Sequence, residues 1–240
     1  MFHFKCFSVD DSASAMKVGT DGVLIGAWSS LDASVKRVLD VGTGSGLIAL
    51  MLAQRSDGEG VTVDCVDIDE GSVAQSRANF DASPWGDRLT VYKSDFQSFE
   101  GAEKYDLIIS NPPYFVDSQL PPNVERGVAR HTTELTFEEL VAGVVRLLNK
   151  DGRFAVILPV NESLQVDRIV EQSGCGLRLV RRCGVQNSEN KPLKRYMSEY
   201  LFDDNSDVEI ERDLLFIREG SPLEYSPRYR DLTADFYLKF

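Results

Sequence analysis

The stretch Val38-Leu39-Asp40-Val41-Gly42-Thr43-Gly44-Ser45-Gly46 decides how the rest of the chain is organised. An apolar run followed at once by a G-x-G-x-G turn is typical of a buried strand that leads into a helix, expected here over Leu47–Gln54. Glycines let the backbone approach a ligand closely, and the N-terminus of a helix presents N–H groups to it. The spacing differs from the G-x-G-x-x-G of dinucleotide enzymes. The sequence also lacks the Gly-Lys-Ser/Thr that binds a triphosphate. We therefore predict a nucleotide-type binding turn.

Outward from this turn, strand-like and helix-like segments alternate. Strands are expected over Arg37–Val41, Val61–Val66, Leu89–Tyr92, Asp106–Ser110 and Arg153–Leu158, and helices around Ser72–Phe80, Thr136–Leu148 and Glu162–Gln172. In Thr136–Leu148 the apolar residues recur every three or four positions, and Thr136 with Glu139 forms a capping box. Gly152 follows as its expected C-cap. The alternation predicts a mostly parallel sheet with helices on both faces.

The last third breaks this alternation. Leu177–Val185, Arg195–Phe202 and Ile210–Ile217 resemble strands without helices between them, which predicts antiparallel additions to one edge of the sheet. Because no repeat or low-complexity linker interrupts the chain, we expect a single domain over residues 1–240. It would comprise an N-terminal extension (1–35), a core (36–175), and an antiparallel edge with the C-terminal segment (176–240).

Composition restricts the classes of function. The chain has 240 residues, of which 42% are hydrophobic, enough for one ordinary core. We expect no membrane span, because no apolar run approaches the roughly 20 residues needed. We also expect no secretory signal, because Met1–Cys6 has no basic region followed by an apolar one. The four cysteines show no C-x-x-C spacing and there are only two histidines, which argues against a metal site and for a reducing cytoplasm.

Charge is unevenly distributed. The net charge of −12 argues against a protein that coats nucleic acid. One segment, Arg178–Arg195, nevertheless carries six basic residues and one acidic residue, a net charge of +5. Two interpretations stay open: the segment is a solvated loop, or it faces the phosphates of a nucleic acid.

A second motif, Asn111-Pro112-Pro113-Tyr114, follows the strand expected at Asp106–Ser110. The Asn111 side-chain carbonyl and the Pro112 backbone carbonyl can each accept a hydrogen bond, and the Tyr114 ring offers a stacking surface. Asn111 and Pro112 both precede a proline, so both are held extended and out of helix hydrogen bonding. The motif therefore predicts a catalytic grip on a planar NH2 group.

Together these motifs resemble those of class I S-adenosylmethionine-dependent methyltransferases. The resemblance implies S-adenosyl-L-methionine as cofactor, held by Asp40, Gly42, Gly44, Gly46, Asp67, Ile68, Asp95 and Phe96. Asp67 would accept the ribose hydroxyls and Asp95 the adenine amino group, with Ile68 and Phe96 against the ring. Asp69 competes for the ribose but fits a helix N-cap better. The implied fold is a doubly wound, seven-stranded Rossmann-like methyltransferase sheet, mostly parallel with antiparallel strands at the C-terminal edge.

The tetrad is similar to those of adenine-N6 and protein glutamine-N5 methyltransferases, and of rRNA adenine-N6 or guanine-N2 enzymes. A DNA enzyme usually needs a separate target-recognition domain, for which 240 residues leave little room. The glutamine enzymes carry a helical domain before the first motif, whereas the motif strand here begins near residue 37.

The two ends of the chain favour RNA. Phe2–Phe7, Ala15–Trp28, Ala129–His131 and Leu232–Phe240 resemble the bacterial tRNA (adenine-N6) methyltransferase family, which modifies adenine 37 of a valine tRNA. The resemblance implies tRNA as partner, with Lys17 and Thr20 near the methionine end of the cofactor. His131 would contact the target base or cap a loop.

An anticodon-loop adenine is already single-stranded and is cheaper to unstack than a duplex base. We therefore expect a cytoplasmic, monomeric tRNA methyltransferase that uses neither membrane nor metal and binds RNA weakly and salt-dependently. Protein glutamine methylation and a non-catalytic RNA-binding module remain the alternatives.

Overall fold

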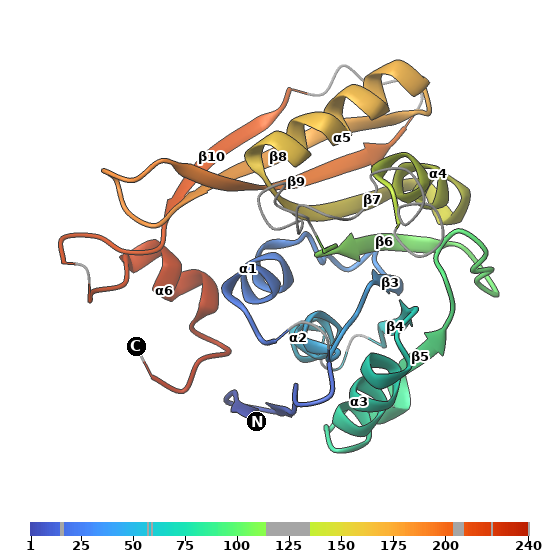
Figure 1. Ribbon diagram of the computed structural model, residues 1–240, viewed down its shortest axis with the longest axis horizontal. Coiled ribbons are helices and arrows are strands. Elements are labelled where there is room, and N and C mark those ends of the chain that lie inside the picture. The colour runs from blue at the N-terminus through green and yellow to red at the C-terminus, as the bar shows by residue number, and fades with distance from the viewer. Residues whose placement is uncertain are drawn as a thin grey trace, which may run out of the picture.

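The computed structural model describes residues 1–14, 17–56, 58, 60–113, 135–203, 209–221 and 223–239. At its centre lies an eight-stranded sheet with the order β10-β8-β9-β7-β6-β3-β4-β5 (Figure 1). Its strands are β3 (Arg37–Val41), β4 (Thr62–Asp67), β5 (Leu89–Lys93), β6 (Tyr105–Ser110), β7 (Leu148–Pro159), β8 (Leu177–Gln186), β9 (Leu193–Phe202) and β10 (Glu211–Phe216). The predicted count of seven is wrong, because β10 pairs with β8 and extends the sheet by one strand.

Strand direction brings several strand ends to one edge of the sheet. Strands β3 to β7 pair in parallel, and β9 pairs antiparallel with both β7 and β8. The predicted antiparallel pairing is confirmed for β8 and β9 and is wrong for β10. Because β9 reverses the direction, β8 runs again as β7 does, and β10 pairs in parallel with β8. The carboxyl ends of β3, β4, β6, β8 and β10 therefore lie at one edge, together with the amino end of β9.

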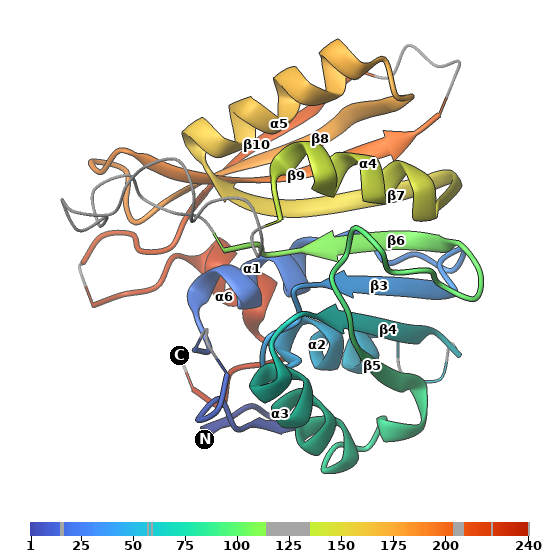
Figure 2. The same ribbon diagram turned by 45° about the vertical axis from the view of Figure 1, so that its right-hand side comes forward.

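Helices cover both faces of the sheet, as the alternation predicts (Figures 1 and 2). The helices α1 (Thr20–Trp28), α2 (Leu47–Arg55), α3 (Glu70–Asp81) and α6 (Pro227–Thr233) pack into one apolar cluster, and α4 (Phe137–Leu147) and α5 (Val160–Ser173) into the other. A short 3-10 turn, η1 (Gly86–Arg88), precedes β5. In the described part of the chain, no helix is long and apolar enough to cross a membrane.

Helix α4 begins as predicted but ends differently. Both hydrogen bonds of the capping box form between Thr136 and Glu139. The helix ends at Leu147, and Leu148 already has the extended conformation that opens β7. Gly152 therefore lies within β7, and its prediction as a C-cap is wrong. A Cβ atom at Gly152 would lie 2.8 Å from the carbonyl oxygen of Asn149, so a close backbone approach accounts for this glycine.

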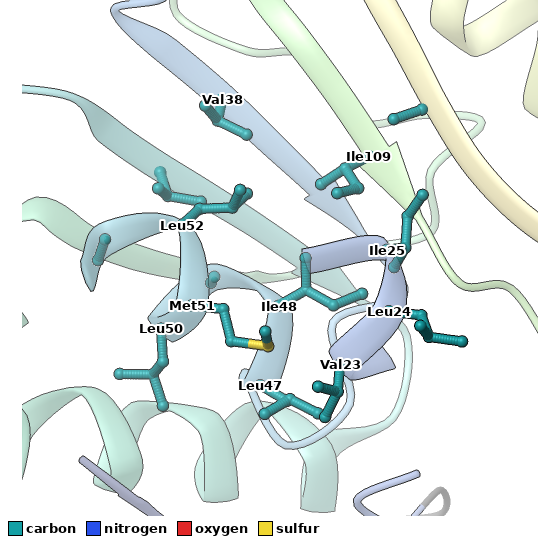
Figure 3. Packing of buried hydrophobic residues seen from close by; sticks show 14 of the residues in the cluster. Val23, Leu24, Ile25, Val38, Leu47, Ile48, Leu50, Met51, Leu52 and Ile109 are labelled. Atoms are coloured by element: carbon teal, nitrogen blue, oxygen red, sulfur yellow. The ribbon is translucent and has the colours of Figure 1, made fainter. Parts of the chain in front are cut away.

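The apolar layer beneath the sheet positions α1 and α2. Helix α1 packs on α2, with Val23 beside Leu47, and Ile25 lies near Ile109 of β6 (Figure 3). Gly26 allows this contact, since a Cβ atom there would lie 2.9 Å from the Met51 sulfur. Burying aliphatic side chains of this size contributes about 1.5–3 kcal/mol each. The N-terminus of α1 is thereby fixed beside the N-terminus of α2.

The two ends of the chain lie together. Strands β1 (Phe2–His3) and β2 (Ser8–Val9) form a small antiparallel sheet. Phe4 forms a bridge with Tyr237, and the Lys5 N–H donates to the Phe236 carbonyl at 2.8 Å. Phe4 and Phe236 are both buried.

Candidate active site

The turn after β3 depends on its glycines. Gly42, Gly44 and Gly46 have φ values of +71°, +57° and +81°, a region that favours glycine. A Cβ atom at Gly46 would collide with the buried ring of Phe80, whereas one at Gly42 would have no described atom within 4 Å. The turn therefore packs tightly on α3 at one end and leaves open space at the other.

That open space belongs to a cavity of about 240 Å³. Its walls are the glycine turn, the N-terminus of α1, and Asn111 at the end of β6. Ser110 donates its hydroxyl to the Val41 carbonyl at 2.8 Å, which ties the end of β6 to the end of β3. Two motifs that are far apart in the sequence thus meet in one cavity.

Asn111 lines this cavity and carries an unsatisfied acceptor. Its Oδ1 atom is buried, and no donor among the described residues lies within hydrogen-bonding distance. A buried polar atom without a partner costs about 1–3 kcal/mol, so such atoms are rare unless a ligand uses them. Pro112 is also buried, whereas Tyr114 and His131 lie outside the described residues.

Asp40 is buried beneath the turn. The hydroxyl of Thr43 donates to its Oδ2 atom at 2.6 Å. Burial raises the pKa of Asp40 to about 7, because the charged carboxylate loses its hydration. Thr43 lines the cavity and Asp40 does not. Asp40 therefore acts on the cavity through the turn that it orients.

Asp67 joins the glycine turn to the end of β4. Its carboxylate accepts the N–H of Gly44 at 2.8 Å and the N–H of Asp69 at 2.9 Å. Burial raises the pKa of Asp67, and these two hydrogen bonds oppose the shift. Asp69 caps α3 by accepting the N–H of Ser72 at 2.7 Å, which confirms its prediction as an N-cap.

The predicted adenine-binding residues differ in exposure. Ile68 is 54% exposed at the end of β4, an unusual place for a large aliphatic side chain. Asp95 is half-buried, and hydrogen bonds from Ser98 lower its pKa. Phe96 is only 4% exposed and packs in the core, where Gly143 of α4 leaves room for its ring. Ile68 therefore offers more apolar surface to a ligand than Phe96 does.

Lys17 and Thr20 both line the cavity, on the side of α1. The Lys17 ammonium donates to the backbone carbonyls of Asp11 at 2.5 Å and Ser12 at 3.1 Å. Lys17 therefore ties down the segment before α1 and contributes its stem to the cavity wall.

An ion pair between Asp21 of α1 and Arg195 of β9 also borders the cavity, and the sequence gives no sign of it. Arg195 pairs with Pro159 in the antiparallel β7–β9 register, which brings the first residues of β9 to the carboxyl edge of the sheet. Only this register reveals that Arg195 is a cavity residue.

The remaining arginines of the basic segment have internal partners. Arg178 pairs with Asp203 at 3.3 Å, and Arg182 pairs with Asp167 at 2.7 Å. Arg181 lies 4.1 Å from the centre of the Trp28 ring and pairs with two glutamates. Within this segment the exposed cations are Lys191 and Lys194. Because these arginines have acidic partners within the fold, the ion pairs count against the interpretation as a phosphate-facing rim.

Comparison with known proteins places the chain in a family. The methyltransferase small domain family matches residues 23–180. The tRNA1(Val) (adenine(37)-N6)-methyltransferase of Bacteroides thetaiotaomicron is 42% identical over 99% of this chain and 97% of its own length. The proteins of that name from Tolumonas auensis and Flavobacterium johnsoniae are 41% and 40% identical, covering 99% and 100% of this chain and 97% and 100% of their own lengths.

Solved structures share the fold at low identity. A predicted O-methyltransferase from Agrobacterium tumefaciens superposes with a TM-score of 0.68 at 16% identity, covering 90% of this chain and 96% of that chain. A putative class I S-adenosylmethionine-dependent methyltransferase from Listeria monocytogenes gives 0.58 at 14% identity, covering 89% and 65%. The sheet, the glycine turn and the full-length relatives agree: the chain belongs to the methyltransferase small domain family and, within it, to the tRNA1(Val) (adenine(37)-N6)-methyltransferases.

Proposed function

We propose that this chain transfers a methyl group from S-adenosyl-L-methionine to N6 of adenine 37 in tRNA1(Val). The observation that carries the proposal is Asn111, which lines the cavity beside the glycine turn and whose buried Oδ1 has no hydrogen-bond donor among the described residues. The full-length relatives carry the name of this reaction. We expect the enzyme to act as a monomer in the cytoplasm.

The cavity and the chain at and just after the ends of β4 and β5 supply residues that fit the cofactor. Lys17, Thr20 and Gly42 line the cavity, whereas Asp67, Ile68, Asp95 and Phe96 do not. When bound, S-adenosyl-L-methionine supplies an electrophilic methyl group on a sulfonium. The open space at Gly42 admits a ligand against the backbone. We assign Lys17 and Thr20 to the methionine end, Asp67 to the ribose, and Asp95 with Ile68 and Phe96 to the adenine. Asp40 and the three glycines hold the turn between these parts.

Asn111 and Pro112 provide the chemistry on the substrate side. The lone pair of an adenine amino group is delocalised into the ring, so the nitrogen is a poor nucleophile. Acceptors at Asn111 Oδ1 and the Pro112 carbonyl that take both N–H hydrogens favour a pyramidal nitrogen with an available lone pair. Holding that nitrogen in line with the methyl group supplies further rate through proximity. The methylated nitrogen is then acidic and releases one proton to water, so no strong base is needed. We assign Tyr114 to stack on the adenine ring.

The decisive experiment measures the product. The purified protein is incubated with labelled S-adenosyl-L-methionine and unmodified tRNA1(Val) transcript, and the RNA is digested to nucleosides. We expect label in N6-methyladenosine, and none with a transcript that carries guanosine at position 37. Label in protein glutamine, in N2-methylguanosine or in no product would refute the proposal.

A further inference from the structure

A second cavity, of about 440 Å³, lies at the same edge of the sheet. It is bordered by Asn187 just after β8 and by Ile217 and Arg218 just after β10. Thr20 of α1 lines both cavities, so the two adjoin. The volume falls within the range of about 300–1,000 Å³ that small-ligand pockets occupy.

Aromatic side chains form a large part of the wall of the second cavity. Phe2, Tyr225, Tyr229 and Tyr237 line it. The rings of Tyr225 and Tyr229 are stacked with their centres 5.1 Å apart, and the Arg218 guanidinium lies 4.4 Å from the centre of the Tyr225 ring. Lys239 adds a second cation. Flat apolar surfaces beside cations are the features that proteins use to hold unpaired bases of RNA.

We propose that the second cavity binds an unpaired base of the RNA next to the adenine that is methylated. This inference rests on the proposed function. The base would stack on the outer face of the Arg218 guanidinium, because the Tyr225 ring already contacts Arg218 and is stacked on Tyr229. Lys239 would approach the adjoining phosphate. Because Thr20 borders both cavities, a nucleotide held here would fix its neighbour beside Asn111.

The charge distribution supports an aromatic contact. The chain carries a net charge of −12, and the arginines of its most basic segment are engaged in internal ion pairs. Within this segment, Lys191 and Lys194 are the cations that stay exposed for phosphate contacts. Stacking needs no excess positive charge and is worth about 1–3 kcal/mol per base. It therefore supplies affinity that the acidic surface cannot.

The test is a double-mutant cycle, in which RNA-binding affinity is compared for protein variants and RNA variants singly and together. Fluorescein-labelled anticodon stem–loop RNA of tRNA1(Val) is titrated with the full-length protein, and binding is followed by anisotropy. The RNA is used intact or with an abasic nucleotide on either side of adenine 37. Arg218→Gln removes the guanidinium and Tyr225→Leu removes the ring. Arg212→Gln makes the same chemical change on exposed β10, outside the cavity.

We expect Arg218→Gln and Tyr225→Leu to weaken RNA binding about tenfold, and Arg212→Gln less than twofold. An abasic nucleotide at one neighbouring position weakens binding to the unaltered protein about tenfold but to Arg218→Gln less than twofold. The affinity for S-adenosyl-L-methionine stays unchanged in all three variants, and the unfolding midpoint stays unchanged in Arg218→Gln. Tyr225→Leu lowers the midpoint slightly, because it loses the stacking on Tyr229.

Equal abasic penalties in both proteins, loss of cofactor affinity in place of RNA affinity, or absence of RNA binding by the unaltered protein would each overturn the inference. The readout is binding, so it is independent of methylation. If the binding results are as expected but no N6-methyladenosine forms, the proposed function alone is refuted. If adenine 37 is methylated but the abasic penalty is the same in Arg218→Gln as in the unaltered protein, the assignment of the second cavity alone is refuted.

Discussion

The cavity around Gly42 and the basic segment Arg178–Arg195 differ in whether their buried polar groups have hydrogen-bond partners. In the cavity, Asn111 Oδ1 is buried without a partner among the described residues. In the basic segment, Arg182 is buried with two hydrogen bonds to Asp167, at 2.7 and 2.8 Å. The first region leaves a polar atom for a ligand, and the second satisfies its charges internally.

This difference separates functional polarity from structural polarity. Removing one partner of a buried ion pair destabilises the fold, because the other partner is left as an uncompensated buried charge. An unpaired acceptor in a cavity costs stability and is explained by binding or catalysis. Substitutions in the basic segment should therefore act on folding, and substitutions in the cavity on turnover.

The largest expected effect is on stability in the basic segment. Asp167→Ala should lower the free energy of unfolding by about 3–5 kcal/mol, because it leaves the Arg182 guanidinium buried and unpaired. The measurement is urea unfolding. Lys93→Ala is the control, since it breaks an exposed pair with Glu70 that is worth less than about 1 kcal/mol. Equal losses in the two variants would show that the Arg182 pair is not structural.

The next effect is on turnover in the cavity. Asn111→Ala should lower kcat by about 100- to 1,000-fold, because one acceptor for the developing charge is removed. Cofactor affinity, measured by calorimetry, should stay within about twofold. Asn190→Ala, at an exposed turn between β8 and β9, is the matched control. A parallel loss of cofactor affinity in Asn111→Ala would assign this side chain to the cofactor.

A smaller effect concerns the dependence of stability on pH. The pKa of Asp40 rises from 3.8 to about 7 in the folded protein, so the folded state binds its proton more tightly than the unfolded state. Its contribution to stability is therefore present at low pH and is lost as pH rises from about 4 to 7. Between pH 5 and 7, Asp40→Asn should remove about 2 kcal/mol of this decline.

The comparison of unfolding curves at pH 5, 6 and 7 isolates this term. Carboxylates with lowered pKa, such as Asp69 and Asp106, are common to both proteins and cancel in the difference. A difference that is constant across these pH values would mean that Asp40 titrates normally.

The smallest effect distinguishes two glycines of one turn. Gly46→Ala should lower stability by about 1–3 kcal/mol more than Gly42→Ala, because only the former places a methyl group against the Phe80 ring. Gly42→Ala should instead lower cofactor affinity by roughly tenfold, because its methyl group enters the cavity. Thermal unfolding and calorimetry measure the two quantities. The reverse pattern would place the ligand on the opposite side of the turn.

Local signals in the sequence predicted much of the fold. The capping box at Thr136, the cap at Asp69 and the strand–turn–helix around Gly42 each involve residues only a few positions apart. Their hydrogen bonds form wherever the chain takes the corresponding local conformation. The same holds for Asn111, which follows directly on a recognisable strand.

Long-range features were not predictable in this way. The pairing of Arg195 with Asp21 depends on the register of β9. The ring of Phe96 packs in the core, because Gly143 of α4, which is far away in the sequence, leaves space for it. A charge count over a segment says nothing of the carboxylates that other strands and helices bring to it.

The sequence by itself thus determined the alternation of elements, the glycine turn and the Asn-Pro-Pro-Tyr motif, because each depends on near neighbours and on backbone preferences. The tertiary structure alone decided that β10 adds an eighth strand in parallel and that the arginines are neutralised. It also decided that the two chain ends enclose a second, aromatic cavity beside the first. Those outcomes depend on which strands pair and in which register, and pairing is settled by burial and packing over the whole sheet.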